Sequence, residues 1–366
     1  MNRFVSLVFA VTLAAASARA APPDPHAILA EEARVVSDHG IDEAKAIEIG
    51  GVRQWITIRG RDRRNPILLV IHGGPAAPEL PNRYLFEAPW IDYFTVVEWD
   101  QRGSGKTFEL NDPAKIAPTM HRERFVEDTV ELTAWLRATY ARKKIFVIAH
   151  SWGTSLGLEL ARRHPDWLYA YIGVGQIIDM RAGEAASYAS VLAEARRRGD
   201  AEAIKELTGI APYPEPNGSL PLEKIALERK WVVRYGGLTH NRDSSDVWEN
   251  AEKLSPDYDE ADFKAIDQGS GFSLPKLLPD MAAIDYSSLR RLNCPIIIFA
   301  GRYDETTPPA PVAAWFERLS APSKRLIWFE NSAHMMYGEE PGRVLVHLVE
   351  DALPFAVRAG DVAPAH

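Results

Sequence analysis

The sequence lacks several features that would point directly to a particular chemistry. Cys294 is its only cysteine, so no disulfide can form within the chain, and we expect this thiol to be a buried apolar group before a strand. No His-Glu-x-x-His motif or other close set of metal-binding side chains occurs. Gly-Lys-Thr at residues 105–107 resembles the end of a phosphate-binding loop, but Asp100 stands where such a loop requires glycine. These absences exclude an internal disulfide, a metal site of familiar spacing and a nucleotide-binding loop.

Positive charge is also scarce. The chain carries 42 Lys and Arg against 50 Asp and Glu, a formal net charge of −8, and it has no long basic block. Three arginines at residues 196–198 are expected to be a solvated helix end. Because binding to nucleic acid depends on neutralising phosphates with Lys and Arg, this balance predicts no nucleic-acid partner. We expect a small-molecule or short-peptide substrate as the partner, and no pattern in the sequence fixes an oligomeric state.

Apolar runs that suggest membrane insertion are absent except at the N-terminus. Arg3 precedes an apolar run over residues 4–16, and Ala-Arg-Ala at residues 18–20 has the small-x-small pattern of a cleavage site. The run is too short and wrongly flanked for a stable anchor. We therefore predict a signal peptide over residues 1–20, cleaved after Ala20, and a secreted or periplasmic mature protein without an integral membrane span. Loss of the two leader arginines would change the formal charge from −8 to −10. An uncleaved N-terminal helix is the alternative.

Apolar stretches of strand length alternate with helical periodicity along most of the chain. The first two expected strands form a hairpin with a glycine turn, and the continuously apolar later ones suit a parallel sheet covered on both faces. The order predicts an α/β fold, a mostly parallel sheet with helices on both faces. Strands are expected at residues 46–49, 52–58, 66–71, 94–99, 144–148, 168–174, 296–300 and 325–329, and helices near 27–36, 122–140, 155–163, 310–319 and 343–355.

A charge-dense helical segment interrupts this alternation between residues 176 and 288. Its helices are expected to break at residues 209–221 and around residues 269–275, which are rich in proline and glycine. We therefore divide the mature chain into a first part of the core (21–175), a helical cap insertion (176–288) and a second part of the core (289–366). Because ligands bind at the carboxyl ends of parallel strands, a cap over that edge would shape the binding pocket.

Ser151 stands at the centre of a local pattern that favours nucleophilic catalysis. An apolar strand leads into it, a helix leads out of it, and Ala149 and Gly153 flank it two residues away on either side. This small-x-Ser-x-small pattern is typical of the nucleophile elbow, a sharp turn that needs small neighbours and lifts the serine hydroxyl clear of the backbone. A buried serine in an ordinary strand–helix turn is the alternative. The pattern alone does not decide between the two.

Two residues beyond the insertion complete a serine-based triad. A serine hydroxyl is a weak nucleophile, so it needs a base, and the base needs an orienting acid. Asp304 follows the strand at residues 296–300, and His334 follows the strand at residues 325–329. Both therefore lie at the same edge of the sheet as Ser151, in the order Ser, acid, His. We predict that Ser151 is the nucleophile, His334 the base and Asp304 the acid.

Other nearby titratable residues suit these roles less well. Glu305 adjoins Asp304 and is the fallback acid. His150 precedes the serine, so its side chain should point away from the hydroxyl at this turn. His72 opens a glycine loop and is expected to fix that loop through hydrogen bonds.

Attack of the serine on a carbonyl would create an oxyanion, which needs preorganised N–H donors. One donor should be the backbone N–H of Trp152, the residue after the nucleophile. The other should come from the loop after residue 71, where glycines allow the backbone to approach closely, and Gly74 is the favoured donor. A simple tight turn is the alternative for this Gly-Gly-Pro segment.

Taken together, five segments of the chain resemble the α/β-hydrolase superfamily and, within it, the proline iminopeptidase group. They are His-Gly-Gly-Pro (72–75), Asp-Gln-Arg-Gly-Ser-Gly (100–105), His-Ser-Trp-Gly-Thr (150–154), Gly-Arg-Tyr-Asp (301–304) and Ala-His (333–334). The resemblance implies an eight-stranded sheet, a helical cap after the sixth strand, no cofactor, and Ser151, Asp304 and His334 as the triad. It also implies release of an N-terminal residue, usually proline, from peptides or arylamides.

The resemblance specifies the substrate less fully. Proteins of this group hold the free ammonium of the substrate with cap glutamates, one of them just after a tryptophan-rich helical stretch. Here residues 231–235 resemble that stretch but are followed by two glycines, so Glu228 and Glu249 are the nearby acids that we assign to substrate binding. Ala76 also stands where the family usually has glycine. Loss of a carboxylate partner for a desolvated ammonium would cost on the order of several kcal/mol and would favour neutral substrates.

Three functions follow from these observations. The leading one is an exported aminopeptidase of the proline iminopeptidase type. A carboxylesterase or amidase that acts on neutral small molecules is the alternative with the same mechanism. A non-catalytic binding protein with this fold is the third, and the intact serine, acid, histidine and glycine loop argue against it.

Overall fold

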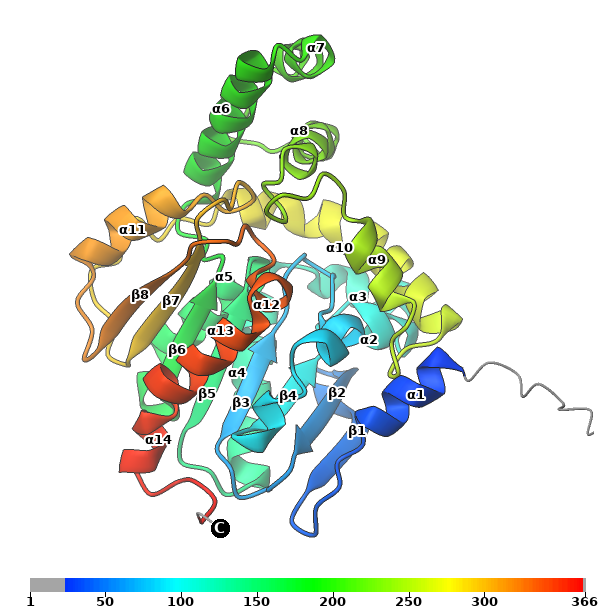
Figure 1. Ribbon diagram of the computed structural model, residues 1–366, viewed down its shortest axis with the longest axis vertical. Coiled ribbons are helices and arrows are strands. Elements are labelled where there is room, and N and C mark those ends of the chain that lie inside the picture. Colours follow the sequence, from blue (N-terminus) through cyan, green and yellow to red (C-terminus); the bar gives the residue numbers. More distant parts are fainter. Residues whose placement is uncertain (1–23, 365–366) are drawn as a thin grey trace, which may run out of the picture.

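The computed structural model describes residues 24–364, so the predicted leader lies outside the described residues. Eight strands form one sheet in the order β1-β2-β4-β3-β5-β6-β7-β8 (Figure 1). β2 is antiparallel to both β1 and β4, and the other neighbouring strands are parallel. This confirms the predicted mostly parallel sheet. The strands are β1 (Ile41–Ile49), β2 (Val52–Gly60), β3 (Ile67–Ile71), β4 (Thr95–Trp99), β5 (Ile145–His150), β6 (Leu168–Val174), β7 (Ile296–Gly301) and β8 (Lys324–Phe329).

The predicted glycine turn joins β1 to β2. Gly50 and Gly51 have φ angles of 56° and 72°, a left-handed conformation that glycine adopts without a steric penalty. The two strands pair over their whole length, from Ile41 opposite Gly60 to Ile49 opposite Val52.

Helices cover both faces of the sheet, which explains the continuously apolar central strands. Val147 and the other odd-numbered residues of β5 belong to the core on one face, with α4 (Arg122–Thr139) and α5 (Trp152–Arg163). Phe146 and Ile148 belong to the core on the other face, which α13 (Pro341–His347) covers. Figure 1 shows α13 and α4 on opposite sides of the strands.

Five helices, α6 to α10, lie between β6 and β7 in the chain and above the upper end of the sheet in Figure 1. The division of the chain at residues 175 and 288 stays a prediction. No helix within residues 24–364 has the length and apolar character needed to cross a lipid bilayer. The remaining helices are α1 (Pro25–Glu32), α2 (Gly105–Glu109), α3 (Pro113–Ile116), α6 (Met180–Arg198), α7 (Ala201–Gly209), α8 (Leu222–Arg234), α9 (Asp246–Glu252), α10 (Glu260–Ala282), α11 (Pro309–Arg318), α12 (Met336–Glu339) and α14 (Pro354–Arg358), with short 3₁₀ turns at Leu80–Leu85, Trp90–Asp92, Ala117–Thr119 and Pro165–Trp167 and a π-helical turn at Leu348–Ala352.

The expected break around residues 269–275 is wrong, because α10 runs through it. The helix contains Pro275 and Pro279, and each proline removes one backbone donor at a cost of about 3 kcal/mol. Packing against the core explains why the helix persists. A Cβ on Gly269 would lie 2.7 Å from the carbonyl oxygen of Gly103, and the Ser273 hydroxyl donates to that same oxygen (2.8 Å). The other expected break, at residues 209–221, is confirmed between α7 and α8.

The expected single helix at residues 343–355 is divided in the structure. α13 ends at His347, a π-helical turn follows, and α14 begins at Pro354. Because proline has no N–H, it favours the start of a new helix over continuation of the preceding one.

Candidate active site

Ser151 occupies a sharp turn between β5 and α5. Its φ of 49° and ψ of −120° lie in a region that non-glycine residues adopt only under constraint, and its N–H donates to the Val174 carbonyl at the end of β6 (2.9 Å). The turn requires Gly153, because a Cβ there would lie 2.3 Å from the carbonyl oxygen of Ile71. Strain at the serine and a small neighbour are the features that the small-x-Ser-x-small pattern predicts.

Asp304 and His334 meet beyond the carboxyl ends of β7 and β8. His334 Nδ1 lies 2.8 Å from Asp304 Oδ2, and both side chains are buried. The Asp304 carboxylate also accepts hydrogen bonds from the N–H groups of Thr306 (2.9 Å) and Thr307 (2.7 Å) and from the Thr307 hydroxyl (2.7 Å). These donors fix the direction of the carboxylate. Asp304 can therefore hold the tautomer of His334 whose Nε2 is able to accept a proton.

The environment keeps His334 neutral near pH 7. Burial lowers the pKa of His334 below its ordinary value of 6.5, although the Asp304 carboxylate opposes this shift. A neutral imidazole is the form that acts as a general base. The fallback acid, Glu305, instead accepts a hydrogen bond from the Ser190 hydroxyl (2.7 Å). The structure thus brings Asp304, and not its neighbour, to the histidine.

Ser151 lies beside this pair without a direct hydrogen bond to it. Within residues 24–364 the Ser151 hydroxyl forms no hydrogen bond with His334. The two residues share the turn after β6, because Ser151 binds Val174 and a Cβ on Gly175 would lie 2.9 Å from His334 Cε1. Gly175, with φ of 57°, leaves room for the imidazole. Hydrogen bonds between a nucleophile and its base often tighten only when substrate binds. The absence of a hydrogen bond between Ser151 and His334 in the described chain is therefore compatible with proton transfer.

Of the two residues predicted to bind an oxyanion, Trp152 follows Ser151 in the chain and Gly74 lies on the loop that approaches it. Trp152 is the first residue of α5, and its N–H has no acceptor in the part of the chain that the structure describes. Gly74 follows β3 with φ of 104°, and its N–H likewise has no acceptor there. A Cβ on Gly73 would lie 3.2 Å from the Cβ of Ser151, so this loop approaches the serine closely. Two unused N–H groups at this position could bind a developing negative charge.

Gln101 joins the glycine loop to the serine turn. Its N–H donates to His72 Nε2 (3.1 Å), and its side-chain amide donates to the His72 carbonyl (2.8 Å). The same side chain accepts a hydrogen bond from Trp152 Nε1 (3.1 Å). The other ring nitrogen of His72 lies 2.8 Å from the Gly73 carbonyl, which confirms that this histidine fixes the loop.

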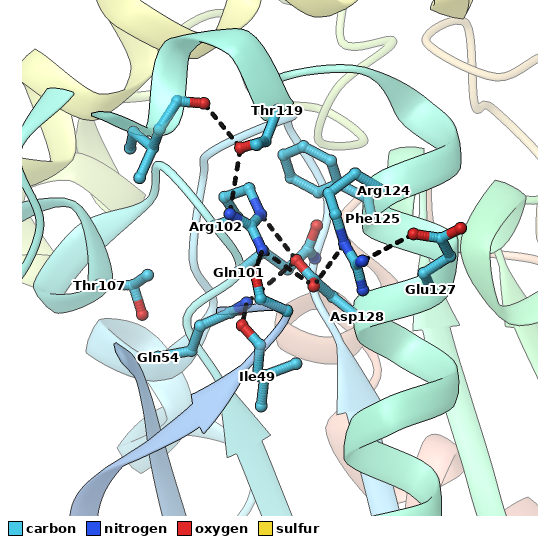
Figure 2. Close-up of polar contacts among 12 residues, drawn as sticks. Ile49, Gln54, Gln101, Arg102, Thr107, Thr119, Arg124, Phe125, Glu127 and Asp128 are labelled. Carbon is cyan, nitrogen blue, oxygen red and sulfur yellow. Dashed lines mark hydrogen bonds and ion pairs between the residues drawn. The ribbon is translucent and has the colours of Figure 1, made fainter. Parts of the chain in front are cut away.

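Arg102, the next residue of the same motif, forms a buried ion pair with Asp128 of α4. Figure 2 shows the two side chains pointing toward one another, with Arg102 Nε 2.8 Å and Nη2 3.0 Å from the carboxylate oxygens. Arg102 also donates to the Gly50 carbonyl (2.9 Å), and Asp128 accepts from Gln54 (3.0 Å) and Arg124 (2.9 Å). Through these hydrogen bonds and ion pairs, Arg102 and Asp128 connect the β1–β2 turn to α4. Within this motif, Gln101 therefore supports the serine turn, whereas Arg102 holds the β1–β2 turn and α4 together.

The two acids assigned to substrate binding lie in different surroundings. Glu249 is exposed on α9 and accepts a hydrogen bond from Ser245 (2.6 Å). Glu228 on α8 is fully buried, where Ser187 donates to it and Arg229 forms an ion pair with it. Within residues 24–364 no grouping of three or more His, Cys, Asp or Glu side chains is arranged to hold a metal ion.

Arg229 links this buried acid to the candidate triad. It also pairs with Glu184 of α6, and its Nη2 lies 3.4 Å from the carbonyl of Thr306, whose N–H binds Asp304. Burial raises the pKa of Glu305 to about 7 in the same region. The Asp304 loop therefore carries the Glu305 carboxylate and contacts Arg229, whose guanidinium pairs with the carboxylates of Glu184 and Glu228.

Two features of the site have no signal in the sequence. The loop at residues 237–240 binds the histidine loop through the N–H of His334, which donates to the Leu238 carbonyl (2.9 Å). Glu79 contacts His150, which lies 71 residues further along the chain. Neither contact has a characteristic spacing, so only the folded chain reveals them.

Comparisons with known proteins agree with this fold. The family model described as alpha/beta hydrolase fold matches residues 66–341. The chain is 28% identical over 300 residues to the probable aminopeptidase YbaC of Bacillus subtilis (strain 168), covering 81% of this chain and 92% of that protein. It is 27% identical over 282 residues to the proline iminopeptidase of Heyndrickxia coagulans, covering 76% and 87%. The crystal structure of a Mycobacterium smegmatis proline iminopeptidase shares the fold, with a TM-score of 0.63 and 18% identity over 87% of this chain and 100% of that one.

Proposed function

Because this chain belongs to the α/β-hydrolase fold family, and its relatives include proteins of the proline iminopeptidase type, we propose that it is a serine hydrolase that works through an acyl-enzyme. Ser151 is the nucleophile, His334 the base and Asp304 the orienting acid. One observation carries the proposal. The 2.8 Å contact between Asp304 and His334 lies at the carboxyl edge of the sheet, where the strained Ser151 turn also ends.

The first half of the reaction forms the acyl-enzyme. Ser151 Oγ attacks the substrate carbonyl while His334 Nε2 takes the hydroxyl proton, and the N–H groups of Trp152 and Gly74 bind the oxyanion. His334 then gives this proton to the leaving nitrogen or oxygen as its bond to the carbonyl carbon breaks. The leaving amine or alcohol departs, and the acyl group remains on Ser151.

The second half repeats these steps with water. His334 takes a proton from the water as its oxygen attacks the acyl carbon, and the same two N–H groups bind the oxyanion. Collapse of the intermediate breaks the bond to Ser151 Oγ, which recovers its proton from His334. The products are a carboxylic acid and free enzyme.

Ser151→Ala tests the mechanism. We expect it to abolish turnover and labelling by a fluorophosphonate probe while the thermal unfolding midpoint stays close to that of the unmodified protein. Ser219→Ala, which removes an exposed hydroxyl between α7 and α8, is the matched control. Undiminished turnover by folded Ser151→Ala protein would refute the proposal.

For the substrate, we propose a peptide from which an N-terminal residue is released. The names of the two relatives support this choice, as does the acidic cluster of buried Glu184, buried Glu228 and half-buried Glu305 at the Asp304 loop. These three carboxylates outnumber Arg229, so a substrate ammonium would find an excess of negative charge there. The exposed position of Glu249 makes Glu228 the stronger candidate of the two acids assigned from the sequence.

A hydrolase of neutral esters or amides is the second candidate, and Arg229 favours it. Its guanidinium already pairs with both Glu184 and Glu228, which reduces their capacity to hold a substrate cation. A panel of proline arylamide, N-blocked proline arylamide and short acyl esters separates the two candidates. Preference for the free amine supports the aminopeptidase, and indifference to the blocking group favours the esterase or amidase.

We also propose export through the N-terminal leader. The short apolar run and the Ala-Arg-Ala segment support this proposal, which is independent of the catalytic one. Expression in a bacterial host with a secretory pathway should give a mature chain that begins at Ala21. Recovery of the chain with its first 20 residues intact, measured by mass spectrometry, would contradict it.

A further inference from the structure

His150, the residue before the nucleophile, contacts the candidate catalytic histidine directly. Its Nε2 lies 3.1 Å from the backbone carbonyl oxygen of His334, and the two imidazole rings are 4.6 Å apart, centre to centre. Its Nδ1 contacts the carboxylate of Glu79, which lies in the segment after the glycine loop. His150 is buried, and the Glu79 side chain is 12% exposed. The Asp304–His334 pair therefore has a second acid–histidine pair packed against it.

The hydrogen bonds determine where the protons of His150 lie. A carbonyl oxygen can only accept a hydrogen bond, so Nε2 of His150 carries a proton. A carboxylate faces Nδ1, and the contact requires one more proton, shared between Nδ1 and Glu79. Burial by itself would lower the pKa of His150, but the charge and hydrogen bond of Glu79 outweigh it and raise the pKa. The two contacts and this shift favour an imidazolium at His150, paired with the Glu79 carboxylate.

The other titratable groups around the pair leave this assignment in place. Burial lowers the pKa of His72 to about 4, so this neighbouring imidazole is neutral. Tyr337 of α12 packs its ring 5.4 Å from that of His150, and burial raises the pKa of its hydroxyl far above neutrality. Burial also raises the pKa of Glu98 on β4, near Glu79, well above its ordinary value. Asp304, on the far side of His334, adds a negative charge that further favours the imidazolium.

We propose that Glu79 and His150 are positioning residues for His334. This inference rests on the proposed role of His334 as the base. Nε2–H of His150 holds the His334 carbonyl, the Leu238 carbonyl holds the His334 N–H, and Asp304 holds Nδ1. Two of these attachments fix the backbone of His334 and the third fixes its ring at Nδ1, which leaves Nε2 available to the serine. The positive charge of His150 also disfavours protonation of His334, which keeps the base active at lower pH.

Two substitutions separate the two effects. His150→Leu removes both the donor and the charge, so we expect kcat to fall by about 10²-fold with KM little changed, as for a catalytic group displaced by about 1 Å. His150→Gln keeps an N–H donor near the Nε2 position without the charge, so most of kcat should return. In both variants the acid limb of kcat/KM should move to higher pH by roughly half a unit, because loss of a neighbouring cation raises the pKa of His334.

A matched control comes from another acid–histidine pair. His347 Nδ1 lies 2.8 Å from Asp351 on the α13 side of the sheet, away from the serine turn. His347→Leu should leave kcat and the acid limb unchanged. Thermal unfolding shows whether each variant is folded. Labelling of Ser151 to completion with a fluorophosphonate gives the concentration of active sites from which kcat is calculated.

A spectroscopic test does not depend on activity. In ¹⁵N-histidine NMR at pH 7.5 we expect protonated shifts for both nitrogens of His150 and the neutral pattern in Glu79→Gln. A neutral His150 in the unmodified protein would overturn the proposal. A His150→Leu enzyme with normal kcat and an unmoved acid limb, while Ser151→Ala is inactive, would overturn it and leave the proposed function standing. If Ser151→Ala were fully active, the proposed function itself would fail, and with it the catalytic part of this inference.

Discussion

His334 is the residue whose protonation should govern the pH dependence of the reaction. Burial lowers its pKa below 6.5, with Asp304 opposing. Only the neutral imidazole can take the serine proton, so kcat/KM should fall as the pH decreases through this lowered pKa and stay level above it. We expect the midpoint of the acid limb below pH 6.5 in a profile of kcat/KM measured with a substrate that does not itself titrate.

Asp304→Asn provides the comparison for this profile. The amide keeps the size of the carboxylate but allows the wrong tautomer of His334, so kcat should fall on the order of 10³- to 10⁴-fold, the scale known for Ser-His-Asp triads. Glu305→Gln, at the neighbouring residue that binds Ser190, should lower kcat much less, because loss of a carboxylate that binds the substrate ammonium raises KM. A midpoint well above 6.5 in the unmodified enzyme, or similar losses in the two variants, would contradict the assignment.

The small-x-Ser-x-small pattern, together with the order of residues after the strands, was enough to predict Ser151, Asp304 and His334 as a triad, because parallel strands end at one edge. It could not select Glu79 as the partner of His150. The segment that carries this glutamate, between the glycine loop and the 3₁₀ turn at Leu80–Leu85, has no regular structure. Its course depends on distant parts of the chain, because Ser270 of α10 donates to the Ala76 carbonyl and the 3₁₀ turn contacts α9. A side chain on such a loop is placed by the whole fold.

At the scale of elements, the Arg102–Asp128 pair should be worth more than any surface ion pair. Both side chains are fully buried, and Asp128 is the point where the β1–β2 turn, the Arg102 loop and α4 meet. Arg102→Met leaves the Asp128 carboxylate with fewer donors in the interior. We expect the free energy of unfolding in urea to fall by about 3–5 kcal/mol.

The double variant Arg102→Met, Asp128→Leu should recover part of this loss, because it removes the unpaired buried charge as well. Arg302→Met breaks an exposed pair with Glu330 and should change stability much less. Equal decreases in the free energy of unfolding for Arg102→Met and Arg302→Met would show that the buried ion pair stabilises the protein no more than the exposed one.

The central strands and the covering of both sheet faces were predictable, because a strand buried on both sides is an unbroken apolar run, as in β3 and β5. The helix boundaries in the insertion were harder to predict. Proline is unfavourable inside a helix, yet Pro275 and Pro279 both lie within α10, because Gly269 and Ser273 fit that helix against the Gly103 loop. Tertiary packing of this kind outweighs local propensity and has no sequence period that could reveal it.

On the scale of the whole molecule, the segment between β6 and β7 is hydrogen-bonded to the loops that carry Asp304 and His334 of the proposed triad. The N–H of Glu305 donates to the Gly237 carbonyl (3.0 Å), and the N–H groups of His334 and Met335 donate to the Leu238 carbonyl (2.9 and 3.2 Å). A Cβ on Gly237 would lie 2.6 Å from the Cβ of Glu305, so the backbones approach closely. The two glycines after the tryptophan-rich stretch, which depart from the family pattern, make this approach possible.

Glu339 of α12 completes the connection and offers a test of it. Its carboxylate accepts the N–H of His240 (2.6 Å) and the N–H of Ala333 (3.0 Å), so one half-buried side chain joins residues 237–240 to the histidine loop. Glu339→Ala leaves both donors unsatisfied. We expect amide hydrogen exchange to become at least about tenfold faster at residues 237–240 and 333–335, with kcat lowered to a similar degree. Exchange at the Ser151 turn and in β5 should not change.

The pattern of exchange separates coupling from general destabilisation. Glu340→Ala is the matched control, since this neighbouring carboxylate accepts from the Ser332 hydroxyl (2.8 Å) and from the N–H of Asn331 but makes no bond to residues 237–240 in the described chain. It should loosen the histidine loop and leave residues 237–240 protected. Faster exchange throughout the sheet of Glu339→Ala would mean that the residue serves global stability. Unchanged exchange at residues 237–240 would contradict the prediction. It would mean that other contacts, and not the Glu339 carboxylate, hold this loop against the histidine loop.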